Sequence, residues 1–293
     1  MMAKLLYIYL AGAALLVSVA HAGNVIVIGA SAGIGREITR VFCKNGYKVG
    51  GIARNESALQ ALQQELGDNF VFKVGDIRTA ESIEIVKQLI QQMGGCDIFV
   101  MNAGIWQDSR NIPTVEGVES LDWKQLLQDQ FATIDTNITG FTRMAATALE
   151  YFIQQKKGHF VGVSSVDAVR GNPACPVYSG TKGFESLYMQ GWRAAFEQTG
   201  VDITITDIRP GYIETYEVGS NAFWVEKVGE AAEAIFDAVI QKKKVAYIKG
   251  RWGLFAAYLS LAPDSIYNYM AMTFGVKNRE NGELVGDWIL AES

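Results

Sequence analysis

The sequence is poor in the residues that build metal sites and disulfide frameworks. It holds three cysteines, Cys43, Cys96 and Cys175, which are widely spaced, and two histidines, His21 and His159, which lie far apart. This spacing matches neither a zinc-ligand pattern nor a set of paired cysteines. We therefore expect no metal site.

Clusters of basic residues are also scarce. The formal net charge is −5, and the one basic run, Lys242-Lys243-Lys244, is typical of a helix end that faces water. Proteins that bind nucleic acid usually carry a basic patch along which the phosphates run. The composition thus argues against a nucleic-acid partner.

Apolar residues and glycine are plentiful instead. The 293 residues are 49% hydrophobic and include 30 glycines, which suits a large buried parallel sheet with tight turns. Strands are predicted near 24–29, 47–53, 70–75, 97–101, 158–164, 201–208 and 244–248. Helices fall between them, the longest at 121–156 and 177–199. This alternation predicts an α/β fold with a seven-stranded, mostly parallel sheet, helices on both faces and active residues at the carboxyl ends of the strands.

A glycine cluster, Gly29-Ala30-Ser31-Ala32-Gly33-Ile34-Gly35, follows the first apolar run and precedes a stretch with helical periodicity. Strand, glycine turn and helix form the context that a phosphate-binding turn requires. Glycines allow the backbone to approach a pyrophosphate, and the helix N-terminus supplies N–H donors. The spacing differs from the commoner G-x-G-x-x-G pattern, so an ordinary tight turn is the alternative.

Tyr178 and Lys182 lie four residues apart, thirteen residues after Ser165. On a helix this spacing places both side chains on one face. A nearby ammonium favours the phenolate and lowers a tyrosine pKa, which makes the phenol a better proton shuttle. With 12 tyrosines in the chain, the pair alone could also arise by chance.

Taken together, these motifs resemble the short-chain dehydrogenase/reductase family over residues 24–250. The resemblance implies one doubly wound Rossmann domain at 23–250, nicotinamide-dependent oxidoreduction of a carbonyl or secondary alcohol, and a homo-oligomer that pairs the two long helices. Candidate cofactor-binding residues are the glycine turn (Gly29, Ser31, Gly33, Ile34, Gly35), Arg54, Asp76 near the adenine, Asn102-Ala103-Gly104, Tyr178, Lys182, and Pro210, Gly211, Ile213 and Thr215 against the nicotinamide.

The resemblance also implies a role for each of four catalytic residues. Tyr178 is the general acid for carbonyl reduction or the general base for alcohol oxidation. Lys182 lowers the Tyr178 pKa and binds the nicotinamide ribose. Ser165, rather than the neighbouring Ser164, hydrogen-bonds the substrate oxygen. Asn137 holds a water that links Lys182 to solvent.

The end of the second strand favours NADP over NAD. An acid there binds the ribose 2′-OH of NAD, whereas an arginine accommodates the 2′-phosphate of NADP. The chain has Ala53 at the position of the acid, followed by Arg54, with Ser31 and Arg36 as helpers. In the alternative interpretation Arg54 is only a solvated charge.

The loop after Gly211 carries four aromatic residues, Tyr212, Tyr216, Phe223 and Trp224. An aromatic lining favours an apolar substrate, such as a lipid-, steroid- or retinoid-like molecule. Two other functions are alternatives. A catalytically silent NADP-binding sensor or scaffold would be expected to lose the catalytic set, and an isomerase or epimerase relative usually carries a larger substrate domain.

Two segments lie outside the expected domain. Residues 1–22 resemble a signal peptide with an Ala20-His21-Ala22 cleavage site, but a membrane anchor or an upstream start codon on a cytosolic enzyme also fits. A secretory, endoplasmic-reticulum, membrane-anchored or cytoplasmic location therefore stays open. Residues 251–293 form an apolar helical extension, which could cap the active site, close a subunit interface or lie on a membrane.

Overall fold

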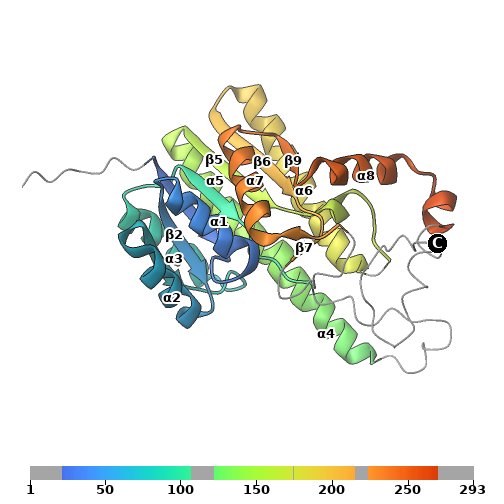
Figure 1. The fold of residues 1–293 in the computed structure, drawn as a ribbon, viewed down its shortest axis with the longest axis horizontal. Helices are drawn as coiled ribbons and strands as arrows, with labels where there is room; N and C mark the ends of the chain where they lie inside the picture. The colour runs from blue at the N-terminus through green and yellow to red at the C-terminus, as the bar shows by residue number, and fades with distance from the viewer. Residues whose placement is uncertain (1–21, 107–121, 174, 215–223, 270–293) are drawn as a thin grey trace, which may run out of the picture.

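Seven runs of apolar residues form the strands of one parallel sheet in the computed structural model, which describes residues 22–106, 122–173, 175–214 and 224–269 (Figure 1). The strands are β1 (Asn24–Ile28), β2 (Lys48–Ala53), β3 (Phe70–Val74), β4 (Ile98–Met101), β5 (Lys157–Val163), β6 (Asp202–Arg209) and β9 (Val245–Tyr247). Their order is β3-β2-β1-β4-β5-β6-β9, and all neighbours pair in parallel. The predicted seven strands are confirmed, and the chain reverses its direction of winding between β1 and β4.

Eight α-helices alternate with these strands in the part of the chain that the structure describes. They are α1 (Gly33–Lys44), α2 (Glu56–Leu66), α3 (Glu81–Met93), α4 (Trp123–Ile134), α5 (Phe141–Gln155), α6 (Pro176–Thr199), α7 (Val228–Ile240) and α8 (Gly250–Leu261). A second, two-stranded pair of β7 (Ile213–Glu214) and β8 (Glu226–Lys227) was not predicted. The long helix expected at 121–156 is divided, because a π turn at Asp135–Gly140 separates α4 from α5.

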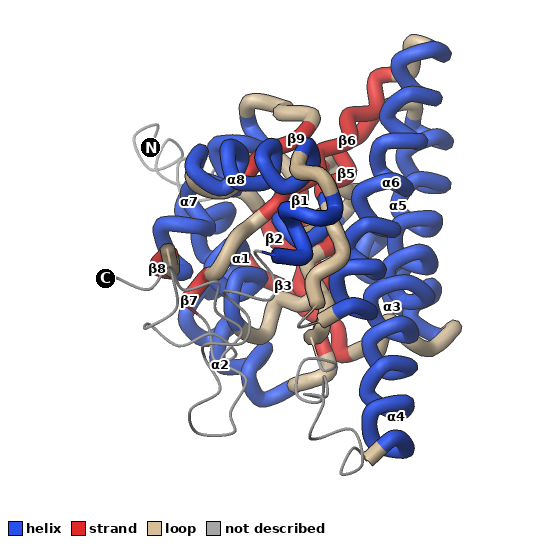
Figure 2. The backbone as a smooth tube through the Cα atoms, turned by 90° about the vertical axis from the view of Figure 1, so that its right-hand side faces the viewer, coloured by secondary structure: helices blue, strands red, loops and turns tan. Residues whose placement is uncertain are grey.

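The sheet is covered on both faces, as Figure 2 shows. Along β1, Val25 and Val27 pack into one buried cluster with residues of α1, α2 and α7. The alternate residues Ile26 and Ile28 belong to a second cluster with residues of α3, α5 and α6. Successive side chains of a strand point to opposite faces, so an uninterrupted apolar run is what a doubly covered strand requires.

The start of α6 is fixed by local contacts that position Tyr178. Pro176 occupies the first turn, where its missing N–H costs nothing. The Ser179 hydroxyl donates to the carbonyl of Pro176 at 3.0 Å and accepts from the N–H of Asn172 at 3.0 Å. Tyr178 therefore sits in a helical turn that is bonded to the segment following β5.

The C-terminal extension begins with α8 and continues as a helical turn from Asp264. Arg170, just after β5, donates to the carbonyls of Leu259 at 2.7 Å and Ala262 at 2.5 Å, and pairs with Asp264. Its guanidinium lies 4.2 Å from the centre of the Tyr267 ring. The extension thus packs against the segment that follows β5.

Within the described ranges, no helix has both the length and the hydropathy needed to cross a membrane. The predicted leader, residues 1–22, lies almost wholly outside those ranges, and so do the last residues of the predicted extension. No group of metal-ligating side chains occurs among the described residues.

Candidate active site

The glycine turn lies where the strand order reverses, at the carboxyl ends of β1 and β4. Gly29 has φ +86°, and a Cβ there would lie 3.0 Å from the backbone of Ala103. A Cβ at Gly35 would lie 2.2 Å from the Gly29 carbonyl oxygen and 2.4 Å from Asn102 Nδ2. Asn102 Nδ2 donates to the same carbonyl at 3.3 Å. Only glycine fits these two positions, so the first turn and the Asn102–Gly104 turn form one closely packed cradle.

The N-terminus of α1 opens from this cradle. Gly33 starts the helix with φ +53°, and the first turn of α1 contains no acidic residue. Ile34 is half-buried and packs against the core, while Ser31 is half-exposed beside it. Free N–H groups and a positive helix end suit a pyrophosphate. The residues present therefore fit a dinucleotide, as the sequence predicts.

Three arginines and two carboxylates lie on α1, on α2 and in the segments that follow β2 and β3. Arg54 is exposed just after β2, and Arg36 on α1 lies 3.9 Å from Glu65 of α2. The Nε atom of Arg36 is buried and has no hydrogen-bond partner. Arg78 pairs with Asp76 at 2.6 Å and, with a smaller contribution from Arg54, holds the Asp76 pKa below its usual value. Asp76 is therefore an ionised acceptor next to a basic edge.

Two adjacent serines at the end of β5 point to different partners. Ser164 donates to the Asp207 carboxylate and to the carbonyl of Ile208, so it faces β6. Ser165 accepts from the N–H of Asp167 at 3.1 Å and hydrogen-bonds Tyr178. Of the two serines, Ser165 is therefore the one that contacts Tyr178.

The π turn aims Asn137 at the same place. Its Oδ1 accepts from the N–H of Ile105 at 2.8 Å, and its Nδ2 donates to the Ile105 carbonyl at 2.9 Å and to Thr181 Oγ1 at 3.1 Å. The side chain is fully buried. Asn137 thereby connects the π turn between α4 and α5 with two other parts of the chain. These are helix α6 and the segment that follows β4.

Lys182 lies deep in the site. Its Nζ donates to the Val163 carbonyl at 3.0 Å and to both carboxylate oxygens of Glu185, at 3.1 and 2.9 Å. The same atom is 5.7 Å from the centre of the Tyr178 ring. A Cβ at Gly104 would lie 3.1 Å from Lys182 Nζ and 3.3 Å from Asn137 Oδ1. The structure thus brings Asn137, Ser165, Tyr178 and Lys182 together beside the Asn102–Gly104 turn.

The pKa of Tyr178 is raised well above its ordinary value of 10. Burial is the largest cause, and the charges of Asp167, Glu185 and Cys175 add to it, while the hydrogen bond with Ser165 acts in the opposite direction. Burial thus outweighs the lowering that the resemblance implies for Lys182, whose ammonium group pairs with Glu185. Tyr178 is therefore a neutral phenol, the form that donates a proton.

The segment that follows β6, from Pro210 to Ile213, lies at the edge of the site. The N–H of Val166 donates to the Pro210 carbonyl at 2.9 Å, which ties this segment to the loop after β5. A Cβ at Gly211 would lie 2.0 Å from the indole ring of Trp252, and Ile213 is buried. Thr215, the other residue predicted to lie against the nicotinamide, lies outside the described ranges.

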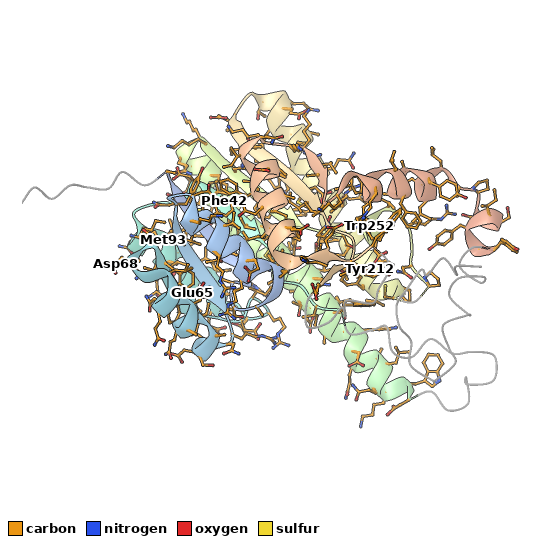
Figure 3. All side chains as sticks on the ribbon, viewed as in Figure 1. Phe42, Glu65, Asp68, Met93, Tyr212 and Trp252 are labelled. Carbon is orange, nitrogen blue, oxygen red and sulfur yellow. The ribbon has the colours of Figure 1, made fainter. Side chains whose placement is uncertain are left out.

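Aromatic residues gather at this edge, and some of them were not predicted. Trp252 contacts Tyr212, Trp224 and Phe255, with ring centres 5.7, 5.4 and 5.9 Å apart. Figure 3 shows Tyr212 and Trp252 together next to α8. Trp252 and Phe255 belong to the apolar extension, for which capping of the active site was one of three interpretations, but neither residue was named as a lining residue. The other predicted lining residues, Tyr216 and Phe223, lie outside the described ranges.

Two further residues near Tyr178 were missed. The Trp106 ring is 6.0 Å from the Tyr178 ring, and its Nε1 is buried without a hydrogen-bond partner. Its position directly after the Asn102–Gly104 turn was the available signal. Glu185 lies one helical turn after Lys182, and an acid at that spacing was likewise a readable signal.

Comparison with known proteins agrees with this geometry. The family model described as short chain dehydrogenase matches residues 23–223. The chain is 30% identical to an uncharacterized oxidoreductase of Myxococcus xanthus, over 72% of this chain and 79% of the relative. It is 31% identical to an NADP-dependent 3-hydroxy acid dehydrogenase of Salmonella typhi, over 71% of this chain and 81% of the relative.

A solved structure shows the same fold. The 3-ketoacyl-(acyl-carrier-protein) reductase of Brucella melitensis, complexed with NADH, aligns with a TM-score of 0.66 and 21% sequence identity. The alignment covers 78% of this chain and 96% of that one. At this identity the likeness concerns the arrangement of strands and helices.

Proposed function

Because the chain belongs to the short-chain dehydrogenase/reductase family, we propose that it transfers a hydride between NADP(H) and an apolar carbonyl compound or secondary alcohol. Tyr178 is the general acid or base. The observation that carries this proposal is the convergence of Tyr178, Ser165, Lys182 and Asn137 beside a cradle that only glycine can line. Relatives of the family are oxidoreductases, and the chain is an enzyme of that class.

Each member of the catalytic set has one task in this proposal. A bound nicotinamide supplies or accepts the hydride. Ser165 orients the substrate oxygen through its hydroxyl, and Tyr178 donates a proton to that oxygen in reduction or accepts it in oxidation. Lys182 holds the nicotinamide ribose, and Asn137 fixes the chain after β4 through its bonds to Ile105.

NADP is the proposed cofactor. Ala53 leaves no carboxylate at the end of β2, and Arg54 is exposed next to it, within range of the Asp76 charge. The buried, unpartnered Nε of Arg36 offers a further donor at this end of the cradle. An arginine at this place accommodates a 2′-phosphate. One of the curated relatives is named as NADP-dependent, whereas the Brucella structure contains NADH.

An apolar substrate fits the residues around Tyr178. The Trp106 ring lies 6.0 Å from the Tyr178 ring, and Trp252 packs against Gly211 together with Tyr212 and Trp224. Binding sites for apolar molecules are lined mainly by aromatic and aliphatic side chains, with few polar groups that fix orientation. Ser165 and Tyr178 supply those polar groups here.

The test is the loss of reduced-nicotinamide absorbance with NADPH and with NADH. The substrate panel runs from small polar aldehydes and diketones to steroids and fatty-chain ketones. We expect turnover with NADPH, highest for the apolar members. In Tyr178→Phe it should fall by at least about 10²-fold, because the proton donor is removed. Tyr188→Phe is the matched control, since Tyr188 lies on the same helix but packs against Phe141.

Three results would contradict parts of this proposal. Activity on small polar carbonyls alone would remove the apolar substrate, and equal use of NADH would remove the argument from Arg54. Tight NADPH binding without turnover on any substrate, in either direction, would favour a catalytically silent sensor.

A further inference from the structure

A buried ion pair stands beside the catalytic tyrosine. Lys182 and Glu185 are one turn apart on α6, and their side chains are only 5% and 1% exposed. Both carboxylate oxygens of Glu185 accept from Lys182 Nζ, at 3.1 and 2.9 Å. The third contact of the ammonium is the Val163 carbonyl at 3.0 Å. Val163 and Glu185 thus hold the ammonium group of Lys182 through three hydrogen bonds, 5.7 Å from the centre of the Tyr178 ring.

We propose that Glu185 is a positioning residue that fixes Lys182 and offsets its charge, so that Tyr178 stays in the protonated form that carbonyl reduction needs. This inference rests on the proposed role of Tyr178. In reduction the substrate carbon accepts a hydride and its oxygen accepts the Tyr178 hydroxyl proton. The phenolate that is left then regains a proton from water.

The electrostatic argument compares a lone ammonium with a paired one. An unpaired Lys182 would favour the phenolate and make Tyr178 a ready base for alcohol oxidation. A carboxylate at hydrogen-bond distance from the ammonium group opposes that effect, because its negative charge disfavours the phenolate. The direct effect of the Glu185 charge is also to raise the pKa of Tyr178.

Other charged groups near the pair act in the same direction or are already engaged. Asp207 on β6 adds negative charge next to Glu185, but it accepts hydrogen bonds from Ser164, Ser186 and Arg209. Asp167, in the turn after β5, opposes ionisation of Tyr178. Burial raises the pKa of Glu185 above its ordinary value, and the charge and hydrogen bonds of Lys182 act in the opposite direction and favour the carboxylate.

The experiment compares the pH profiles of kcat/KM for reduction and oxidation in the wild type and in Glu185→Gln. Glutamine keeps the shape and can still accept from Lys182, but it carries no charge. In Glu185→Gln, we expect the part of the kcat/KM profile that reports ionisation of Tyr178 to move to lower pH by about one unit or more. Oxidation at neutral pH should then rise by about tenfold, because one pKa unit is a factor of ten in the ionised fraction.

Two control variants separate charge from packing. Glu185→Asp keeps the charge and should keep the wild-type profile. Glu197→Gln removes a charge from the same helix about 18 Å away, at about 1.5 Å per residue, where Glu197 pairs with Lys244 on the surface. It should leave both profiles unchanged. If Glu185→Gln does not fold, Glu185→Met makes the same change in charge and is held to the same expectation.

A second readout does not need turnover. The ultraviolet tyrosinate titration of wild type minus Tyr178→Phe isolates one phenol, and the same difference is measured in the Glu185→Gln background. A lower pKa in that background supports the inference even if no substrate is found. An unchanged profile and titration, or an equal shift in Glu185→Asp, would overturn it. Loss of all turnover in the wild type would instead count against the proposed function.

Discussion

At the scale of single residues, His159 is the buried group with the clearest effect on stability. It lies on β5, and its Nε2 is 2.8 Å from Thr206 Oγ1 on β6. Burial lowers its pKa to about 4, with a smaller effect of Lys242. The unfolded chain binds a proton near pH 6.5, so His159 contributes full stability above that pH, and the contribution is lost as pH falls toward 4.

We predict that His159→Gln reduces the loss of stability in acid. Between pH 7 and pH 5 the wild type should lose about 2 kcal/mol of unfolding free energy through this residue, on the order given by 1.36 kcal/mol for each pKa unit. Urea denaturation of both proteins at the two pH values measures the difference. If the variant lost the same unfolding free energy between pH 7 and pH 5, other groups would be its cause. Glu185 is not such a group, because its pKa is raised in the folded state and its contribution to stability increases as the pH falls.

At the scale of elements, the glycine turn and helix α6 use glycine in opposite ways. A Cβ at Gly35 would meet the Gly29 carbonyl oxygen at 2.2 Å, whereas a Cβ at Gly191, in α6, would meet nothing within 4 Å. Gly35 therefore has a steric reason to be glycine. Gly191 has none in the part of the chain that the structure describes, and glycine within a helix costs backbone entropy.

The paired prediction is that Gly35→Ala and Gly191→Ala change stability in opposite directions. Gly35→Ala should destabilise the fold by a few kcal/mol, as overpacking against backbone does, and weaken NADPH binding by at least tenfold. Gly191→Ala should stabilise it by about 0.5–1 kcal/mol without changing that binding. Thermal unfolding and NADPH fluorescence titration check both. If Gly35→Ala bound NADPH as tightly as the wild type, the backbone around position 35 would have to shift enough to accommodate a methyl group.

The same elements show which features of the structure can be predicted from the sequence. The strands were predictable because their apolar runs and bounding glycines are local signals. The resemblance to the family supplied the four candidate catalytic residues, and the structure brings them together. The π turn at Asn137 was not predictable, since one extra residue in a helix leaves the apolar periodicity on each side almost unchanged. The contact of Trp252 with Gly211 joins distant parts of the chain, so no local pattern encodes it.

At the scale of the whole molecule, apolar side chains remain exposed on α4 and α6. Trp123, Leu127 and Phe131 on α4, and Leu187 on α6, are 61%, 54%, 56% and 68% exposed. An apolar surface of this kind usually marks a contact with another chain. It lies on the two long helices that the family resemblance pairs between subunits, and we propose that a second copy of the protein covers it.

We predict that Leu187→Glu shifts the protein toward the monomer, because a charge at an apolar interface must be desolvated. Light scattering during size-exclusion chromatography measures the mass. Leu254→Glu is the matched control, since Leu254 is 78% exposed on α8 and should leave the mass unchanged. A monomeric wild type would refute the proposed interface.

The hydrogen bonds of Arg170 affect the order in which the protein folds during its synthesis. During synthesis the N-terminal part of a chain leaves the ribosome first and can fold first. The sheet grows outward from β1 in that order, yet Arg170 and Gly171 beside the catalytic serine find their partners only at Leu259, Ala262 and Tyr267. The strands up to β6 can thus pair before the loop after β5 is secured, because the partners of Arg170 follow it in the chain by 89 residues or more.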